Sequence, residues 1–201
     1  MAFDQITATV IANSCLNGTY HLLTLEYDAV AGMTQTQPGH FVMLKPSRAD
    51  GPLLGRPMSI LSWEGLGDSR ERVEVFYKVH GVGTAQLATL RAGEEISYLG
   101  PLGQPFPKLE RQNVLLVGGG VGIPPLVYWC RENAANLAVA RKLFFMGGRT
   151  ANDLFYEQEL RDAGTEVITA TQNGEAGHHG LVTAPFEERL SQLGKDTTVL
   201  T

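Results

Sequence analysis

Short apolar and β-branched runs, separated by turn signals, fill the first half of the chain. The runs Asp4–Cys15 and Thr19–Tyr27 flank Asn17-Gly18, a dipeptide typical of a tight hairpin turn. Further strands are expected at His40–Lys45, Arg56–Trp63, Arg72–Val79 and Ile96–Leu99, and a short helix at Thr84–Leu90. Several short strands with one small helix predict an antiparallel β-barrel.

The second half has a different hydrophobic pattern, in which continuous apolar runs alternate with stretches of helical periodicity. Strands are predicted at Asn113–Val117, Arg141–Met146, Glu166–Thr171 and Thr197–Leu200. Helices are predicted at Pro124–Asn136, Asn152–Ala163 and Pro185–Leu193. Strands buried on both faces read as apolar runs, and this alternation is typical of a doubly wound parallel α/β sheet. We therefore expect a β-barrel domain over 1–106 and an α/β domain over 107–201, with the boundary near Gln104–Glu110.

Composition narrows the choice of partners and location. The chain has 201 residues, of which 43% are hydrophobic and 18% charged, and its net charge is −5. These values permit a packed core, and the absence of Lys/Arg blocks argues against nucleic acid as the main partner. No apolar run approaches the roughly 20 residues of a membrane span, and Met1 to Val10 do not read as a signal peptide. We therefore expect a cytoplasmic protein with no membrane partner.

Two segments of the first domain suit a phosphate-bearing ligand. In Arg56-Pro57-Met58-Ser59, the guanidinium can grip a phosphate bidentately and the serine can hydrogen-bond a ring edge. Phe76-Tyr77-Lys78 leads into Gly81-Val82-Gly83-Thr84, where a helix opens whose free N–H groups suit a pyrophosphate. Taken singly, each segment also fits an ordinary strand or loop-to-helix turn.

A third segment, Val117-Gly118-Gly119-Gly120-Val121-Gly122-Ile123-Pro124-Pro125, lies between a predicted strand and a predicted helix. This context favours dinucleotide binding, since glycines let the phosphates approach the backbone. The prolines distinguish it from the usual Gly-x-Gly-x-x-Gly pattern. No acidic residue follows at the spacing usual for a ribose contact, and Arg141 lies there instead.

Read in order, these segments resemble a known group of flavoproteins. Arg-Pro-Met-Ser, Tyr-Lys-x-x-Gly-x-Gly-Thr, Gly-Pro-Leu-Gly and Val-Gly-Gly-Gly-Val-Gly-Ile-Pro-Pro-Leu are similar to the ferredoxin–NADP reductase superfamily. Within it, the chain most resembles the electron-transfer subunit of dihydroorotate dehydrogenase type B. The resemblance runs from about Gln5 to Thr201 and includes Phe145–Arg149 and Thr171–Gly174.

The resemblance implies a role for each motif residue. Arg56 would clamp the pyrophosphate of FAD, Met58 after Pro57 would pack against the flavin, and Ser59 would be the catalytic residue near flavin N5. The remaining flavin contacts would be Phe76, Tyr77, Lys78, Gly83 and Thr84. Contacts with the nicotinamide dinucleotide would be Gly118, Gly119, Gly120, Val121, Gly122, Ile123 and Pro124, with Gly148, Arg149, Thr171 and Gln172 near its adenosine half.

Three departures from the pattern stand out. Met58 replaces an aromatic common in the wider superfamily, and Lys78 replaces an arginine. The C-terminal Cys-Gly-Pro segment and its four cluster cysteines are absent, and two cysteines cannot ligate a 2Fe–2S cluster. Since the loop after a sheet strand usually lines the ligand cleft, we expect the natural chain to extend beyond Thr201, where a cluster could lie. His178 and His179 have no metal-ligand partner at suitable spacing, so no metal site is expected here.

Three functions remain open. The first is an FAD-dependent electron-transfer subunit that exchanges electrons between NAD(P)(H), with NAD favoured, and a partner. That partner would be a flavin-containing dihydroorotate dehydrogenase subunit of pyrimidine biosynthesis, or another redox protein, in a hetero-oligomer or dimer. The second is a stand-alone NAD(P)H:flavin or ferredoxin reductase. The third is a nucleotide-binding module without turnover.

Overall fold

A computed structural model describes residues 5–47, 54–109, 112–136, 139–194 and 196–201. The chain folds into two compact units, unit 1 over Met1–Pro105 and unit 2 over Phe106–Thr201. The expected strand start at Asp4 and the end of the expected boundary at Glu110 lie outside the described residues.

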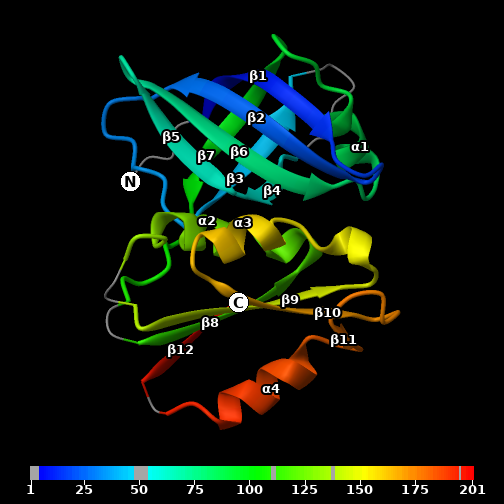
Figure 1. Ribbon diagram of the computed structural model, residues 1–201. Coiled ribbons are helices and arrows are strands. Elements are labelled where there is room, and N and C mark those ends of the chain that lie inside the picture. The colour runs from blue at the N-terminus through cyan, green and yellow to red at the C-terminus, as the bar shows by residue number, and fades with distance from the viewer. Residues whose placement is uncertain (1–4, 48–53, 110–111, 137–138, 195) are drawn as a thin grey trace. The chain divides into compact units, whose positions relative to one another are not determined.

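Unit 1 contains one curled antiparallel sheet and one short helix (Figure 1). Its strands are β1 (Gln5–Cys15), β2 (Tyr20–Asp28), β3 (Phe41–Pro46), β4 (Arg56–Ser59), β5 (Ser62–Gly67), β6 (Arg70–Lys78) and β7 (Glu95–Leu102), and its helix is α1 (Val82–Ala88). Among the described residues the strand order is β4-β3-β7-β1-β2-β6-β5. The hairpin predicted at Asn17-Gly18 is confirmed, since β1 pairs with β2 and Gly18 has a φ of 79°.

The curl of this sheet follows from the path of the chain between its two edges. Strands β4 and β5 lie at opposite ends of the strand order, yet only Ile60 and Leu61 separate them. The Ile60 N–H donates to His40 O at 3.4 Å, and the Leu61 N–H donates to Glu74 O at 2.8 Å. The two edges must therefore approach each other. The single strand predicted over Arg56–Trp63 is wrong for the same reason, because the chain crosses there from one edge to the other.

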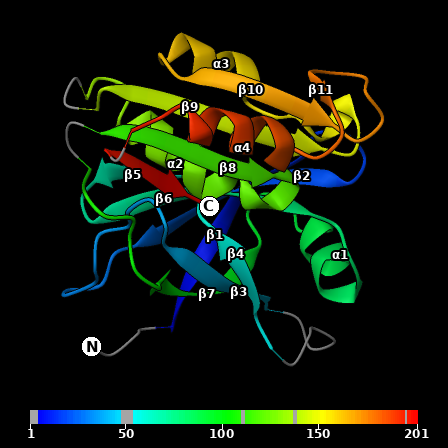
Figure 2. The same cartoon turned by 90° about the horizontal axis from the view of Figure 1, so that it is seen from below.

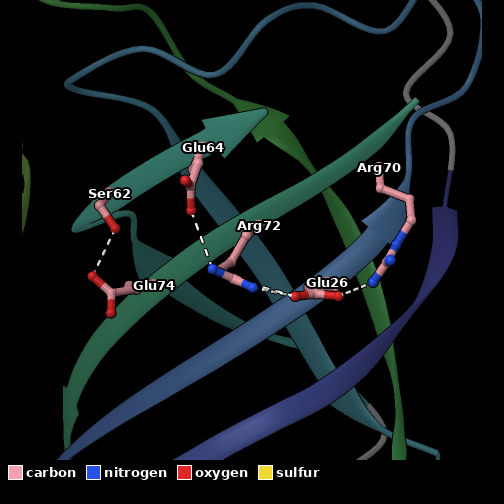
Figure 3. Close-up of polar contacts among 6 residues, drawn as sticks. All are labelled: Glu26, Ser62, Glu64, Arg70, Arg72 and Glu74. Atoms are coloured by element: carbon pink, nitrogen blue, oxygen red, sulfur yellow. Dashed lines mark hydrogen bonds and ion pairs between the residues drawn. The ribbon is translucent and has the colours of Figure 1, made fainter. Parts of the chain in front are cut away.

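A network of ion pairs ties together three strands of unit 1 (Figure 3). Glu26 of β2 is 8% exposed and lies between Arg70 and Arg72 of β6. Arg72 Nη2 is 2.6 Å from Glu26 Oε1, and Arg72 Nη1 is 3.2 Å from Glu64 Oε2 on β5. The hydrogen bond from Arg72 and the charges of both arginines lower the pKa of Glu26, although burial opposes this effect.

We expect Glu26→Gln to destabilise unit 1 at neutral pH by about 1–3 kcal/mol, since hydrogen bonds to a charged group are lost. A carboxylate with a lowered folded pKa stabilises the protein above its ordinary value of 4.5 and loses this contribution as pH falls through the folded pKa. The stability difference between wild type and variant should therefore shrink below about pH 4.5 in urea titrations. Glu64→Gln is the control, because its side chain is 62% exposed. A pH-independent difference would contradict the assignment.

Unit 2 contains a parallel sheet with helices on both faces. Its strands are β8 (Asn113–Gly119), β9 (Arg141–Gly148), β10 (Glu166–Thr171), β11 (His178–His179) and β12 (Thr197–Leu200). In the described residues the strand order is β11-β10-β9-β8-β12, and every pair is parallel. The helices are α2 (Pro124–Glu132), α3 (Glu157–Asp162) and α4 (Thr183–Ser191), with 3₁₀ turns η1 (Gly120–Gly122) and η2 (Ala151–Asp153). Figures 1 and 2 place α4 on one face of the sheet and α2 and α3 on the other.

The core of unit 2 follows from the apolar strands. Leu115 and Phe145 are fully buried, and the ring of Phe145 meets that of Phe186 on α4 edge-on, at 5.5 Å between centroids.

A charged side chain, that of Lys142, is buried among the apolar residues of β9, where it is 8% exposed. Its ammonium donates to three carbonyl oxygens near the ends of α2 and α3, which offsets the cost of burial. The predicted fold class, an antiparallel barrel-like sheet followed by a parallel α/β sheet, is confirmed.

The single helix predicted over Asn152–Ala163 is wrong in its first half. The chain forms η2 and then passes through Tyr156, whose φ of 64° lies in the left-handed region, before α3 begins at Glu157. The Asp153 carboxylate accepts the N–H groups of Arg149 and Thr150, at 3.1 and 3.2 Å. This side-chain capping of a short turn competes with a continuous helix.

Candidate flavin and dinucleotide sites

The first two predicted motifs of unit 1 meet in the structure. A Cβ at Gly83 would lie 2.9 Å from Cζ and 3.0 Å from Nη2 of Arg56, so only glycine lets the guanidinium lie against the first turn of α1. Arg56 Nη1 donates to Leu54 O at 3.3 Å. Within the described part of the chain, no carboxylate forms an ion pair with Arg56. A cation so placed beside a helix start suits an anionic ligand.

Strand β4, which carries Arg56, is an edge strand paired with β3. Its register sets Leu44 opposite Arg56 and Phe41 opposite Ser59. Pro57 is exposed, whereas Met58 and Ser59 are half-buried. Proline is tolerated here because an edge strand leaves one row of N–H groups without a partner. The flavin contacts expected of these side chains stay predictions.

The start of α1 is shaped by Thr84. Its hydroxyl accepts the His80 N–H at 2.6 Å and donates to Gly81 O at 3.2 Å, while Gly81 has a φ of 87°. The hydroxyl therefore closes the turn. Since the N–H groups of a first helical turn have no intrahelical acceptor, a contact with pyrophosphate would pass through the backbone rather than through this hydroxyl.

Residues Phe76, Tyr77 and Lys78 alternate between the two faces of β6. The Phe76 ring stacks on Tyr20 at 5.3 Å, and the Lys78 ammonium lies 4.4 Å from the centroid of the same Tyr20 ring. The Tyr77 side chain lies on the other face of β6. Tyr77, like Phe76, is 2% exposed, and its hydroxyl donates to Asn13 Oδ1 at 3.0 Å. Burial raises the pKa of Tyr77 to about 12. The Tyr77 side chain thus faces the interior of unit 1.

Asn13 extends this contact to α1. Its amide donates to Leu87 O at 2.8 Å and to Leu90 O at 3.1 Å, which satisfies carbonyl groups at the end of the helix. Tyr77 and Asn13 together fix the helix that carries Gly83. Sequence reasoning missed Asn13 and Tyr20, since neither belongs to a motif and only the pairing of β1 and β2 with their neighbours brings them here.

The glycines of the glycine-rich segment of unit 2 differ in what surrounds them. A Cβ at Gly118 would lie 2.8 Å from Leu126 Cδ1 of α2, and a Cβ at Gly119 would collide with Gly147 O of β9. These two glycines are required by packing within the protein. Gly120 has a φ of 54°, and a Cβ at Gly122 would meet nothing within 4 Å. Of the segment's glycines, Gly122 therefore leaves the space that a ligand could use.

The rest of this segment differs in exposure. Val121 is 50% exposed, whereas Ile123 and Pro124 are buried. Pro124 is the first residue of α2, as predicted, because a missing N–H costs nothing in the first turn. A ligand contact would therefore fall on Gly120–Gly122 rather than on the two buried side chains.

The segments predicted to meet the adenosine half lie side by side at the carboxyl ends of β9 and β10. The Gln172 N–H donates to Gly148 O at 3.1 Å, and the Asn173 N–H donates to Arg149 O at 3.2 Å. The Arg149 side chain is 71% exposed. Thr171 is fully buried, and its hydroxyl bonds both the N–H and the carbonyl of Ala176. Thr171 thus holds the loop, while Arg149 and Gln172 face solvent.

Curated relatives match the chain over most of its length, although no protein-family model matches it. The electron transfer subunit of dihydroorotate dehydrogenase B (NAD(+)) from Shouchella clausii is 39% identical, over 100% of this chain and 74% of its own length. The subunits of that name from Bacillus velezensis and Enterococcus faecalis are 37% and 36% identical, over 69% and 71% of their own lengths. The chain belongs to this family of electron transfer subunits. The family predicted from the motifs is confirmed.

Solved structures of other proteins share the fold of this chain. The ferredoxin reductase of carbazole 1,9a-dioxygenase has a TM-score of 0.81 at 18% identity, over 99% of this chain and 61% of that one. An NADH-dependent reduced ferredoxin–NADP oxidoreductase has a TM-score of 0.75 at 22% identity, over 96% of this chain and 66% of that one. At such identities the likeness establishes the fold alone.

Two features are absent from the described residues. None of their helices combines the length and apolar character needed to cross a bilayer. Nor do they gather three or more His, Cys, Asp or Glu side chains into a group that could hold a metal ion.

Proposed function

We propose that this chain is an FAD-binding electron-transfer subunit that passes electrons between NAD(H) and a partner redox subunit. The observation that carries the proposal is the Arg56 guanidinium lying against Gly83 at the start of α1. Two motifs that are separated along the chain meet there. Among the described residues, no carboxylate forms an ion pair with this guanidinium. Membership of a family of electron transfer subunits supports the same function.

The residues of unit 1 fit the pyrophosphate of FAD. Arg56 would hold it through the guanidinium, and the backbone of α1 would supply N–H groups. Ser59 and Met58 on β4 would orient the flavin ring, and Asn13 and Tyr77 would keep α1 in place. FAD supplies the redox chemistry when bound, including the change between two-electron and one-electron transfer.

In unit 2, Gly120–Gly122 would admit the phosphates of the nicotinamide dinucleotide, and the loops after β9 and β10 would take its adenosine half. The cysteines in this sequence, Cys15 and Cys130, are too few for a 2Fe–2S cluster, which needs four ligands. The partner proposed from the names of the relatives is a dihydroorotate dehydrogenase catalytic subunit.

Purification of the chain tests this function directly. We expect a yellow protein with the absorption bands of FAD, which anaerobic NADH bleaches. Mixed with a dihydroorotate dehydrogenase catalytic subunit, the chain should transfer NADH-derived electrons to it and co-elute with it. A colourless protein that cannot be reconstituted with FAD would overturn the proposal. NADH-dependent reduction of artificial acceptors without any complex would favour a stand-alone reductase instead.

A further inference from the structure

The loop after β9 has its backbone donors occupied by carboxylates. Asp153 Oδ2 accepts the N–H groups of Arg149 and Thr150, at 3.1 and 3.2 Å. Glu175 Oε2 accepts the N–H of the next residue, Ala151, at 3.1 Å. Three consecutive N–H groups at the carboxyl end of a parallel strand therefore point at two negative charges.

This arrangement is unfavourable for a phosphate monoester. Consecutive backbone N–H groups are a common means of binding anions, and here the protein's own carboxylates already use them. Arg149 is the cation at this place, and its Nε lies 4.0 Å from the same Asp153 oxygen. A phosphate brought here would compete with Asp153 for Arg149 and would lie close to two carboxylates.

The same arrangement suits hydroxyl groups. Glu175 lies in the loop after β10, which is tied to β9 through the bonds to Gly148 and Arg149, and its own N–H donates to Asn173 Oδ1 at 3.2 Å. One carboxylate oxygen of Glu175 is thus fixed by Ala151, and its other oxygen has no partner in the described residues. An ionised carboxylate only accepts hydrogen bonds, whereas the 2′- and 3′-hydroxyls of a ribose can donate them.

We propose that Glu175 accepts the ribose hydroxyls of the adenosine half of the dinucleotide and, with Asp153, selects NAD(H) over its 2′-phosphorylated form. This inference rests on the proposed function, because it assumes that the adenosine half binds at the ends of β9 and β10. It explains how the chain can lack an acidic residue at the usual spacing after the glycine-rich segment. The carboxylate comes instead from the loop after the following strand, β10.

Titrations of the purified chain with NADH and with NADPH, followed by calorimetry, test the inference. Glu175→Gln keeps an acceptor for the Ala151 N–H but removes the charge. We expect it to weaken NADH binding about tenfold, as for the loss of a charged hydrogen bond, and to strengthen NADPH binding. Glu187→Gln on α4 makes the same charge change on an exposed residue of unit 2 and should leave both affinities unchanged.

The outcomes separate this inference from the proposed function. A wild-type chain that binds NADH while Glu175→Gln keeps the same ratio of NADH to NADPH affinity would overturn the role of Glu175 and leave the function standing. Equal shifts in Glu175→Gln and Glu187→Gln would also overturn it, since the effect would then come from net charge alone. A wild-type chain that binds neither nucleotide would overturn the function and the inference together.

Discussion

Replacing Arg56 with alanine is expected to give a folded protein that purifies without FAD. The guanidinium lies against Gly83, and its removal leaves the backbone of a seven-residue helix to hold the pyrophosphate. Loss of charge-assisted bidentate hydrogen bonds is expected to weaken FAD binding by about a hundredfold or more. The ratio of flavin to protein absorbance after gel filtration, and titration of the apoprotein with FAD, measure the effect.

Two further variants sharpen this test. Arg91→Ala removes an exposed arginine of unit 1 that belongs to no motif, and it should retain the flavin. Gly83→Ala keeps Arg56 but adds a Cβ where the guanidinium lies, so it should also lose flavin without a change in net charge. If Arg56→Ala binds FAD as tightly as the wild type, the guanidinium has no part in the site.

Alanine at Gly119 and alanine at Gly122 are expected to have opposite consequences. The Cβ at position 119 would collide with Gly147 O and lie 3.1 Å from Gly147 C on the adjacent strand, so β8 and β9 would have to separate. We expect a loss of about 3 kcal/mol or more in the stability of unit 2. At Gly122 the Cβ meets open space, so stability should change by less than about 1 kcal/mol, while NADH affinity should fall.

The two glycine variants can be compared in a background that reports on unit 2 alone. With Trp63→Phe, the buried Trp129 of α2 is the remaining tryptophan, and its fluorescence follows unfolding in urea. Calorimetric titration with NADH gives the affinity of each variant. Equal stability of the two variants would show that the strands tolerate the extra methyl group, and full NADH affinity in Gly122→Ala would place the ligand elsewhere.

The order of the motifs along the chain was enough to predict the family, and their local patterns were enough to predict most elements. Asn17-Gly18 specifies a hairpin and Pro124 a helix start through the torsion angles of a few residues. By contrast, Arg56–Trp63 is apolar enough to suggest one strand, and its break at Ile60 depends on partners at His40, just before β3, and in β6. A local pattern does not contain that information.

The chain's sequence therefore determined its fold class and the place of its glycine-rich turns, because these depend on periodicity and on the conformational preferences of single residues. The residues predicted to meet a dinucleotide stay predictions. Only the tertiary structure decided which glycine serves packing and which leaves room for a ligand, and which carboxylate reaches the end of β9. Gly119 and Gly122 look alike in sequence, and Glu175 lies 24 residues from the Ala151 N–H that it accepts. Such distinctions arise from contacts between segments far apart along the chain, which exist only once the sheet has formed.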